Sequence, residues 1–157
     1  MTPDPRQRFE VVAFFPADHA EAVNGKVYLN GGFWNRLNFP EYPAVIGTMA
    51  LIAVIHVPFH EYQEDHKFAL GMVDADEKAS PFHVEGVFRV GAAADLRRGD
   101  PTIMPIAVPV TGLKIDRAGD YSFTLDVDGS ELARFQFRAV QLATPLKFEL
   151  DNPDKPE

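Results

Sequence analysis

The chain has 157 residues, of which 46% are hydrophobic, and its 15 basic and 23 acidic side chains give a net charge of −8 at pH 7. An acidic surface opposes binding to phosphate backbones and anionic lipid, so we do not expect nucleic acid or a membrane as a partner. The sequence contains no cysteine, which excludes disulfides, thiolate nucleophiles and cysteine-bound zinc.

Both ends of the chain are rich in proline and charge, and we expect residues 1–6 and 149–157 to be flexible. Residues 7–148 then form a single domain, because a chain of this length is well served by one core. The polar N-terminus lacks the apolar stretch of a signal peptide, and no apolar run approaches the roughly 18 residues of a membrane helix. We therefore expect a cytoplasmic protein.

The first predicted elements are a strand and a short helix. Residues 8–15 have the composition of a strand, which Pro16 is expected to end. Asp18 and Glu21 have the spacing of a helix capping box, and the Asn24-Gly25 pair is a common helix stop. This pattern predicts a helix of one or two turns, too short to form a layer of the fold.

The middle of the chain predicts a central strand and its neighbours. Residues 45–57 are apolar on both alternating sets, as a strand covered on both faces must be. Residues 67–73 are expected to pair with that strand, and residues 82–90 alternate as a half-exposed strand does. The two prolines of segment 103–110 have the same parity, so their missing N–H groups lie on one side, and this predicts an edge strand.

A hairpin around Asp128-Gly129 is the clearest local signal. Phe123 precedes the turn and Phe135 follows it, and a two-residue turn would direct these two rings to opposite faces. The pattern instead predicts a three-residue turn over residues 127–129 with a bulge at the glycine, which pairs Phe123 with Ala133.

Together these segments predict an all-β protein. About eight short strands with regularly spaced turns are typical of an antiparallel β-sandwich, either immunoglobulin-like or jelly-roll-like, here with one short N-terminal helix. The sequence lacks a long amphipathic helix, and α/β folds are therefore disfavoured.

Three stretches of the sequence resemble a known protein family. They are ADHA and NGKVYLNGGFW within residues 17–34, HVP followed by HKFAL and DAD within residues 56–76, and GDYSFTLDVDGSELARFQFR at residues 119–138. The match extends over roughly residues 9–140 and resembles a family of uncharacterised bacterial proteins that look like stand-alone β-sandwiches. The resemblance implies the fold and adds no catalytic residue.

The densest group of polar side chains includes His56, His60 and His66. Three imidazoles with three neighbouring carboxylates could coordinate Zn²⁺ or Mn²⁺. Their spacing matches no metal motif, and Pro58 opposes the helix that would align His56 with His60. A solvated loop is the alternative interpretation, and we predict no bound cofactor.

Aromatic side chains are the other candidates for a contact site. Phe33 and Trp34 follow a Gly-Gly turn and, with Tyr62, could form a platform for a partner's side chain or a sugar ring, although core packing would also explain them. No serine lies in a nucleophile motif. We therefore expect a non-enzymatic interaction or structural module that binds a protein partner or itself, as a homo-oligomer, through an open sheet edge or an aromatic patch. A small-ligand or carbohydrate-binding module is the alternative.

Overall fold

The computed structural model describes residues 8–91, 95 and 97–142. These residues form the strands β1 Glu10–Val23, β2 Lys26–Gly32, β3 Arg36–Phe39, β4 Ala44–Val57, β5 His66–Asp74, β6 Ala79–Phe88, β7 Thr102–Ile115, β8 Gly119–Val127 and β9 Ser130–Gln141, and one short 3-10 helix, η2 Phe59–Glu61. In the described part of the chain, no helix is long and apolar enough to span a membrane. The predicted flexible ends, 1–6 and 149–157, lie outside the described residues.

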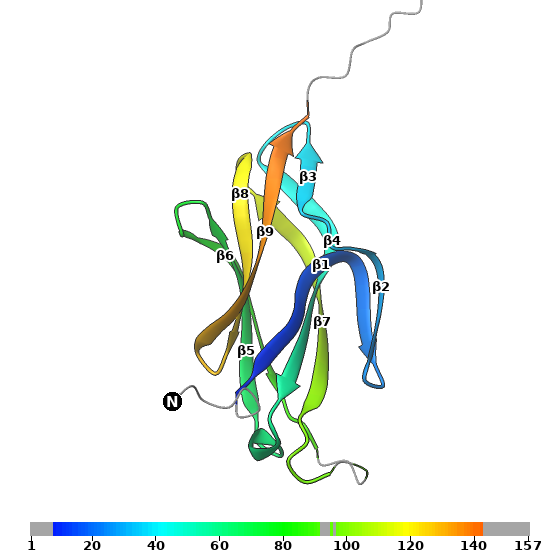
Figure 1. Ribbon diagram of the computed structural model, residues 1–157. Coiled ribbons are helices and arrows are strands. Elements are labelled where there is room, and N and C mark those ends of the chain that lie inside the picture. Colours follow the sequence, from blue (N-terminus) through cyan, green and yellow to red (C-terminus); the bar gives the residue numbers. More distant parts are fainter. Residues whose placement is uncertain (1–7, 92–94, 96, 143–157) are drawn as a thin grey trace, which may run out of the picture.

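The strands form two sheets, of order β2-β1-β4-β7 and β3-β9-β8-β5-β6 (Figure 1). Neighbouring strands are antiparallel except β3 and β9, which run parallel. The predicted all-β class is therefore confirmed, with two mostly antiparallel sheets.

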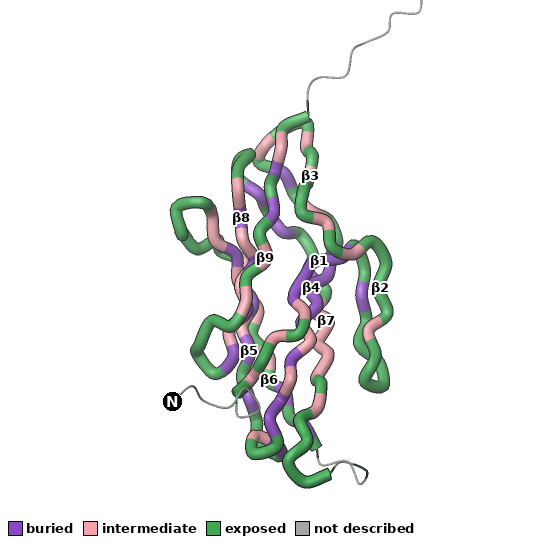
Figure 2. The backbone as a smooth tube through the Cα atoms, in the orientation of Figure 1, coloured by how far each residue is buried: buried purple, intermediate pink, exposed green. Residues whose placement is uncertain are grey.

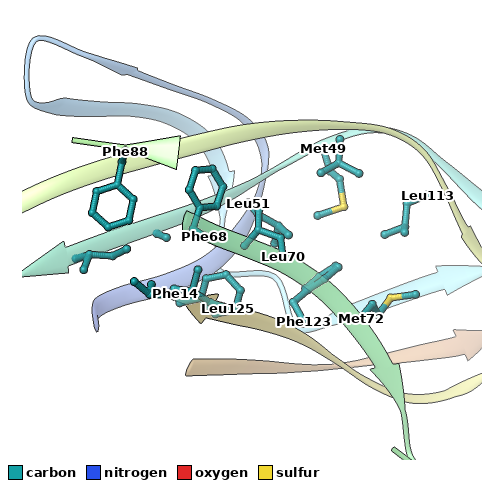
Figure 3. Close-up of a cluster of buried hydrophobic side chains, with 14 of the residues drawn as sticks. Phe14, Met49, Leu51, Phe68, Leu70, Met72, Phe88, Leu113, Phe123 and Leu125 are labelled. Atoms are coloured by element: carbon teal, nitrogen blue, oxygen red, sulfur yellow. The ribbon is translucent and has the colours of Figure 1, made fainter. Parts of the chain in front are cut away.

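Buried side chains from both sheets meet in one core (Figure 3). The four-stranded sheet contributes residues such as Phe14, Met49, Leu51 and Leu113, and the five-stranded sheet contributes Phe68, Leu70, Met72, Phe123 and Leu125. Phe123 is fully buried, and its ring stacks on that of Phe137 at a centroid distance of 4.7 Å. The alternation of buried and exposed residues along each strand thus brings the two sheets together face to face.

The strand predicted to be central and covered on both faces is β4, and both parts of that prediction are confirmed. Leu51 points into the main core, whereas Ala50 and Ile52 pack in a second cluster with Ala17 and Ala20. The β1–β2 hairpin lies over this outer face and reaches β7, and β4 is correspondingly buried in Figure 2. Alanine side chains are small enough to let the hairpin approach β4 closely.

The helix predicted after Pro16 is wrong. β1 continues through Pro16 to Val23 and pairs with β2. Asn24 and Gly25 have φ values of 50° and 73°, as a two-residue hairpin turn requires. A helix of one or two turns makes few hydrogen bonds for the residues it orders. Pairing with β2 satisfies the backbone instead, so the Asn-Gly pair acts as a hairpin signal.

Two predictions of strand pairing had different outcomes. β5 pairs with β6 and β8, so the predicted pairing of residues 67–73 with the central strand is wrong. The inward residues of β5 face β4 across the core, and apolar alternation alone does not say which sheet a strand joins. The predicted edge strand is confirmed, because β7 is the last strand of its sheet, with Pro105 opposite Val54 and Pro109 opposite Ala50.

The β8–β9 hairpin differs from its predicted form. Asp128 and Gly129 alone form the turn, with φ values of 49° and 83°, so the predicted three-residue turn is wrong. A bulge at Leu132 inserts one extra residue into β9 and restores the parity, so that Phe123 lies opposite Phe135. The two rings share a face, as the pattern required, but the irregularity lies beyond the turn.

Candidate functional site

The three histidines predicted as metal ligands have different surroundings. His66 begins β5 and is 3% exposed. His56, on β4, is more exposed and has its Nδ1 3.8 Å from a carboxylate oxygen of Glu10. His60, on η2, is exposed, with its Nε2 3.4 Å from Glu61.

His66 is held by two hydrogen-bond acceptors. Its Nδ1 lies 2.8 Å from the Asp128 carboxylate, and its Nε2 lies 2.9 Å from the backbone oxygen of Glu61. The rings of Phe9 and Phe88 pack against it at 4.8 and 5.4 Å. Because both partners accept, both ring nitrogens donate, and the ring is an imidazolium.

The pKa values of this pair follow from the same contacts. Burial lowers the pKa of His66, but the hydrogen bonds to Glu61 and Asp128 more than offset it, so this pKa lies above its ordinary value of 6.5. Burial alone would raise the pKa of Asp128, but hydrogen bonds from His66 and from the backbone N–H of Lys67 hold it below its ordinary value of 3.8. Both shifts favour the charged forms of the two groups.

The possible metal-binding group in the described residues differs from the predicted one. Ligand atoms of Glu61, Glu64 and His66 lie within 4.8 Å of one another, and neither His56 nor His60 belongs to this group. A metal would need a free nitrogen lone pair on His66, and both ring nitrogens are already used as donors. This geometry fits a clamp that ties η2, β5 and the β8–β9 turn together better than it fits a metal centre.

The structure does not bring Phe33, Trp34 and Tyr62 together on one exposed face. Trp34 packs edge-on against Phe123 at a centroid distance of 6.3 Å, and its Nε1 is buried without a partner among the described residues. Tyr62 is buried, and its hydroxyl donates to the backbone oxygen of Asp100 at 2.8 Å. Phe33 alone of the three presents its ring to solvent, at 65% exposure.

Phe33 combines this exposure with a strained backbone. Its φ of 63° lies in the left-handed region, which is unusual for a bulky side chain. Its N–H donates to the backbone oxygen of Pro16 at 2.9 Å, and its ring stacks on Phe15 at 4.0 Å. These contacts hold the ring at the point where the chain leaves β2 and crosses towards β3.

A cleft of about 420 Å³ lies between β1 and β9, lined by residues 9–14 and 132–134. We call these residues, together with Phe33, the β1/β9 flank (Figure 1). The two strands each carry a β-bulge here, at Val12 and at Leu132. Both bulged residues are apolar and exposed, at 52% and 36%. Phe33 does not line the cleft itself, but its ring lies 6.4 Å from that of Phe135, the next residue along β9 after the lining.

Sequence reasoning identified Phe33 but missed the rest of the flank. The parity conflict in the hairpin was a usable signal, because it requires an extra residue somewhere in the hairpin. The sequence pattern was interpreted as an extra residue in the turn, whereas in the structure the extra residue is Leu132 in β9. The bulge at Val12 becomes visible only through the pairing of β1 with β4.

A second cavity, of about 450 Å³, lies on the outer face of β5 and β6. Its lining includes Lys67, His83, Glu85, Val87 and Asp126. His83 and Glu85 form an exposed pair with a nitrogen to oxygen distance of 2.9 Å. This cavity is thus partly apolar and carries both charge signs.

The described residues thus define an all-β fold of two sheets, with exposed apolar side chains at Val12, Phe33 and Leu132 near the cleft between β1 and β9. The chain belongs to a family of unknown function, DUF6941, whose model matches residues 12–140. A comparison with curated proteins found no similar sequence. Among solved structures, the chain is similar to the Pseudomonas fluorescens alkylpurine DNA glycosylase AlkC bound to DNA containing an abasic site analog, with 10% identity and a TM-score of 0.41. The match covers 84% of this chain and 30% of that one, and at this TM-score it carries no argument about function.

Proposed function

We propose that this protein is a non-enzymatic interaction module with an immunoglobulin-like β-sandwich fold. The strand orders β1-β4-β7 and β9-β8-β5-β6 correspond to those of the two immunoglobulin sheets. The hydroxyl of Tyr121, early in β8, donates to the backbone oxygen of Arg117 at 2.6 Å, in the manner of a tyrosine corner. This connectivity favours the immunoglobulin-like alternative over a jelly roll.

The contact surface in this proposal is the β1/β9 flank, which binds a protein partner or a second copy of the chain. The observation that carries the proposal is the exposed ring of Phe33 at a left-handed φ. Backbone strain of this kind persists where the surroundings enforce it, and it clusters at functional sites. The bulges at Val12 and Leu132 add exposed apolar groups at the cleft between β1 and β9.

A non-enzymatic role is supported by the state of the ionisable groups. His66 is the buried charged side chain of the described core, and its hydrogen bonds leave no lone pair for general base chemistry. Ser80 uses its hydroxyl to accept from the N–H of Phe82 at 3.2 Å, which is a local turn contact.

Replacing Phe33 with glycine tests the proposal, because it removes the ring and the strain together. Releasing the left-handed strain should gain about 1–2 kcal/mol, and losing the stack on Phe15 should cost about 1 kcal/mol, so stability should stay within about 1 kcal/mol of wild type. Complexes seen by analytical ultracentrifugation, and proteins captured from lysate and identified by mass spectrometry, should be lost with Phe33→Gly.

Val45→Ser is the matched control, because Val45 is 59% exposed and lies at the start of β4, outside the flank. It should retain every complex that the wild type forms. A wild-type protein that stays monomeric at high concentration, and that captures the same proteins as Phe33→Gly, would refute the proposal.

The cavity on β5 and β6 supports a second candidate, a small-ligand or carbohydrate-binding module. Its size lies within the range of small-molecule sites, and Lys67, His83 and Glu85 offer polar contacts around an apolar floor. A thermal-shift screen of mono- and disaccharides should then give a hit that His83→Ala abolishes. A screen without hits would remove the carbohydrate reading.

A further inference from the structure

The β1–β2 hairpin contains both Asn-Gly pairs of the sequence, Asn24-Gly25 and Asn30-Gly31. Asparagine deamidates most readily before glycine, because glycine has no Cβ to hinder the approach of its backbone nitrogen to the asparagine side chain. The two pairs have different surroundings in the hairpin, so the structure predicts different fates for them.

Asn24 and Gly25 form the turn of this hairpin, and both are exposed (Figure 1). The ladder between the two strands closes at Val23 and Lys26, so the N–H of Gly25 lies outside it. A Cβ built on Gly25 would meet no atom within 4 Å. The backbone nitrogen that must react is therefore open to water and free of the ladder.

Asn30 and Gly31 lie within β2 and are more constrained. Asn30 pairs with His19 of β1, and the side chain of Asp18 packs directly against Gly31. Deamidation begins when the glycine nitrogen loses its proton, and the Asp18 carboxylate disfavours a second negative charge beside it. Both the pairing and the charge therefore protect Asn30.

We propose that Asn24 is a site of spontaneous modification, at which the chain converts to a mixture of aspartate and isoaspartate. The deprotonated nitrogen of Gly25 attacks Cγ of Asn24, a C–N bond forms, and the side-chain nitrogen leaves as ammonia. Water then opens the resulting succinimide ring at either carbonyl carbon, which gives aspartate or isoaspartate. The reaction consumes one water molecule and needs no oxidant or reductant.

The turn must open before the ring can form. Asn24 has a φ of 50°, and in this compact turn the nitrogen of Gly25 is directed away from the Asn24 side chain. Opening disturbs little packing, because Val23 is 45% exposed and Lys26 is exposed as well. At Asn30 the same rotation must also break the pairing of β2 with β1.

Isoaspartate changes the hairpin more than aspartate does. It leads the main chain through the former side chain and so inserts one methylene into a two-residue turn, whereas an Asp-Gly pair forms the same turn as Asn-Gly. Val27 follows this turn and packs against the cluster of Ala20 and Ile52 that covers the outer face of β4. The isoaspartate form should therefore loosen this end of the hairpin and its cover over β4.

Peptide mapping of the full chain tests the site. The protein is incubated in mildly alkaline buffer made with heavy-oxygen water and is then digested with trypsin in ordinary water. Trypsin cleaves after Lys26, so Asn24 and Asn30 lie in different peptides. Asn24 should take up the label at least about tenfold faster than Asn30. Asn24→Gly is the matched control, because a Gly-Gly pair keeps the turn but has no side chain to react.

Amide exchange tests the effect on the hairpin. Ion exchange separates the isoaspartate form from the native chain. The amides of Glu21 and Tyr28, which are paired beside the turn, should then exchange at least about tenfold faster, while that of Phe123 in the core should be unchanged. Asn24→Asp carries the same added charge without the extra methylene, and it should exchange as the wild type does.

Three results would overturn the proposal. Equal rates at Asn24 and Asn30 would show that the hairpin does not select the site. An Asn24 that stays intact in the folded chain, after a synthetic peptide of residues 9–26 has fully converted, would show that the turn does not open. Unchanged exchange of Glu21 and Tyr28 in the isoaspartate form would refute the loosening of the hairpin.

Discussion

Phe123→Ala should lower the free energy of unfolding by about 4 kcal/mol, the largest loss expected for a single substitution proposed for this protein. Phe123 is fully buried, and its ring contacts Trp34, Phe82 and Phe137. Truncation removes apolar surface from the core and leaves a cavity that stacked rings cannot easily fill. For a domain of this size, we expect the midpoint of thermal unfolding to fall by about 10 °C.

Urea unfolding followed by Trp34 fluorescence measures this loss, because the indole lies against Phe123. Phe33→Ala is the matched control, since it makes the same chemical change at a ring that is 65% exposed. It should cost no more than about 1 kcal/mol. Similar losses in the two variants would contradict the placement of Phe123 at the centre of the core.

The strands that were predicted correctly are those whose own residues indicate whether they are covered on both faces or lie at an edge. Residues 45–57 are apolar on both parities, and β4 is the strand covered by the opposite sheet on one face and by the β1–β2 hairpin on the other. Pro105 and Pro109 marked β7 as an edge, because a missing N–H limits where a strand can lie whatever its partners are.

The wrong predictions of a helix, a turn and a strand pairing arose where one local sequence pattern is compatible with two structures. Asn24-Gly25 ends helices and also turns hairpins, and the choice depended on β2, which pairs with the residues before it. The parity conflict around Phe123 was real, but a bulge at any position in the hairpin satisfies it, and the structure has it at Leu132. The partner of β5 could not be read from alternation, since both sheets need apolar inward faces.

The candidate site was likewise predicted only where a local pattern indicates it. An exposed aromatic residue after two glycines was visible in the sequence, but Trp34 looked equally suitable and instead packs in the core beside Phe123. The flank depends on two bulges that face one cleft from strands more than a hundred residues apart in the chain, and no local pattern reports that. The histidine prediction located His66 but not its partner, because Asp128 comes from a distant turn.

Asp128→Asn should reverse the direction in which the pKa of His66 is shifted. Asparagine tolerates the left-handed φ of 49° at this turn position, so the hairpin is retained. Its single amide oxygen accepts from the Lys67 N–H, which turns the amide NH₂ towards His66. The ring then accepts at Nδ1, donates from Nε2 to Glu61 and stays neutral. Without the carboxylate, burial dominates and the pKa of His66 should fall below 6.5.

The NMR titration of the His66 ring protons reads this change directly. In the wild type the transition should lie above pH 6.5, since the pKa of His66 is raised. In Asp128→Asn it should lie below that value. A transition on the same side of 6.5 in both proteins would show that Asp128 does not determine the protonation state of the ring.

The same substitution should give a pH-dependent loss of stability. A raised folded-state pKa means that the wild type gains stability from His66 below pH 6.5 and loses it as the pH rises through the folded value. The lowered pKa of Asp128 means that its contribution is present above its ordinary value of 3.8 and disappears only as the pH falls through its folded value. The difference between wild type and Asp128→Asn should therefore be largest near about pH 5 and shrink at alkaline pH.

The size of that difference is limited by solvent. A charge-assisted hydrogen bond contributes about 1.5–3 kcal/mol, and because the Asp128 side chain is 46% exposed, screening should reduce the loss to about 1–2 kcal/mol at pH 5. Glu85→Gln is the control, because His83 and Glu85 form a pair of similar length that is exposed on both sides. The hydrogen bond from His83 lowers the pKa of Glu85, but both side chains are exposed and water screens the pair, so removing it should change the pH profile of unfolding only slightly. A loss in Asp128→Asn that stays constant from pH 5 to 9 would mean that Asp128 stabilises the fold only through its turn and not through the charge on His66.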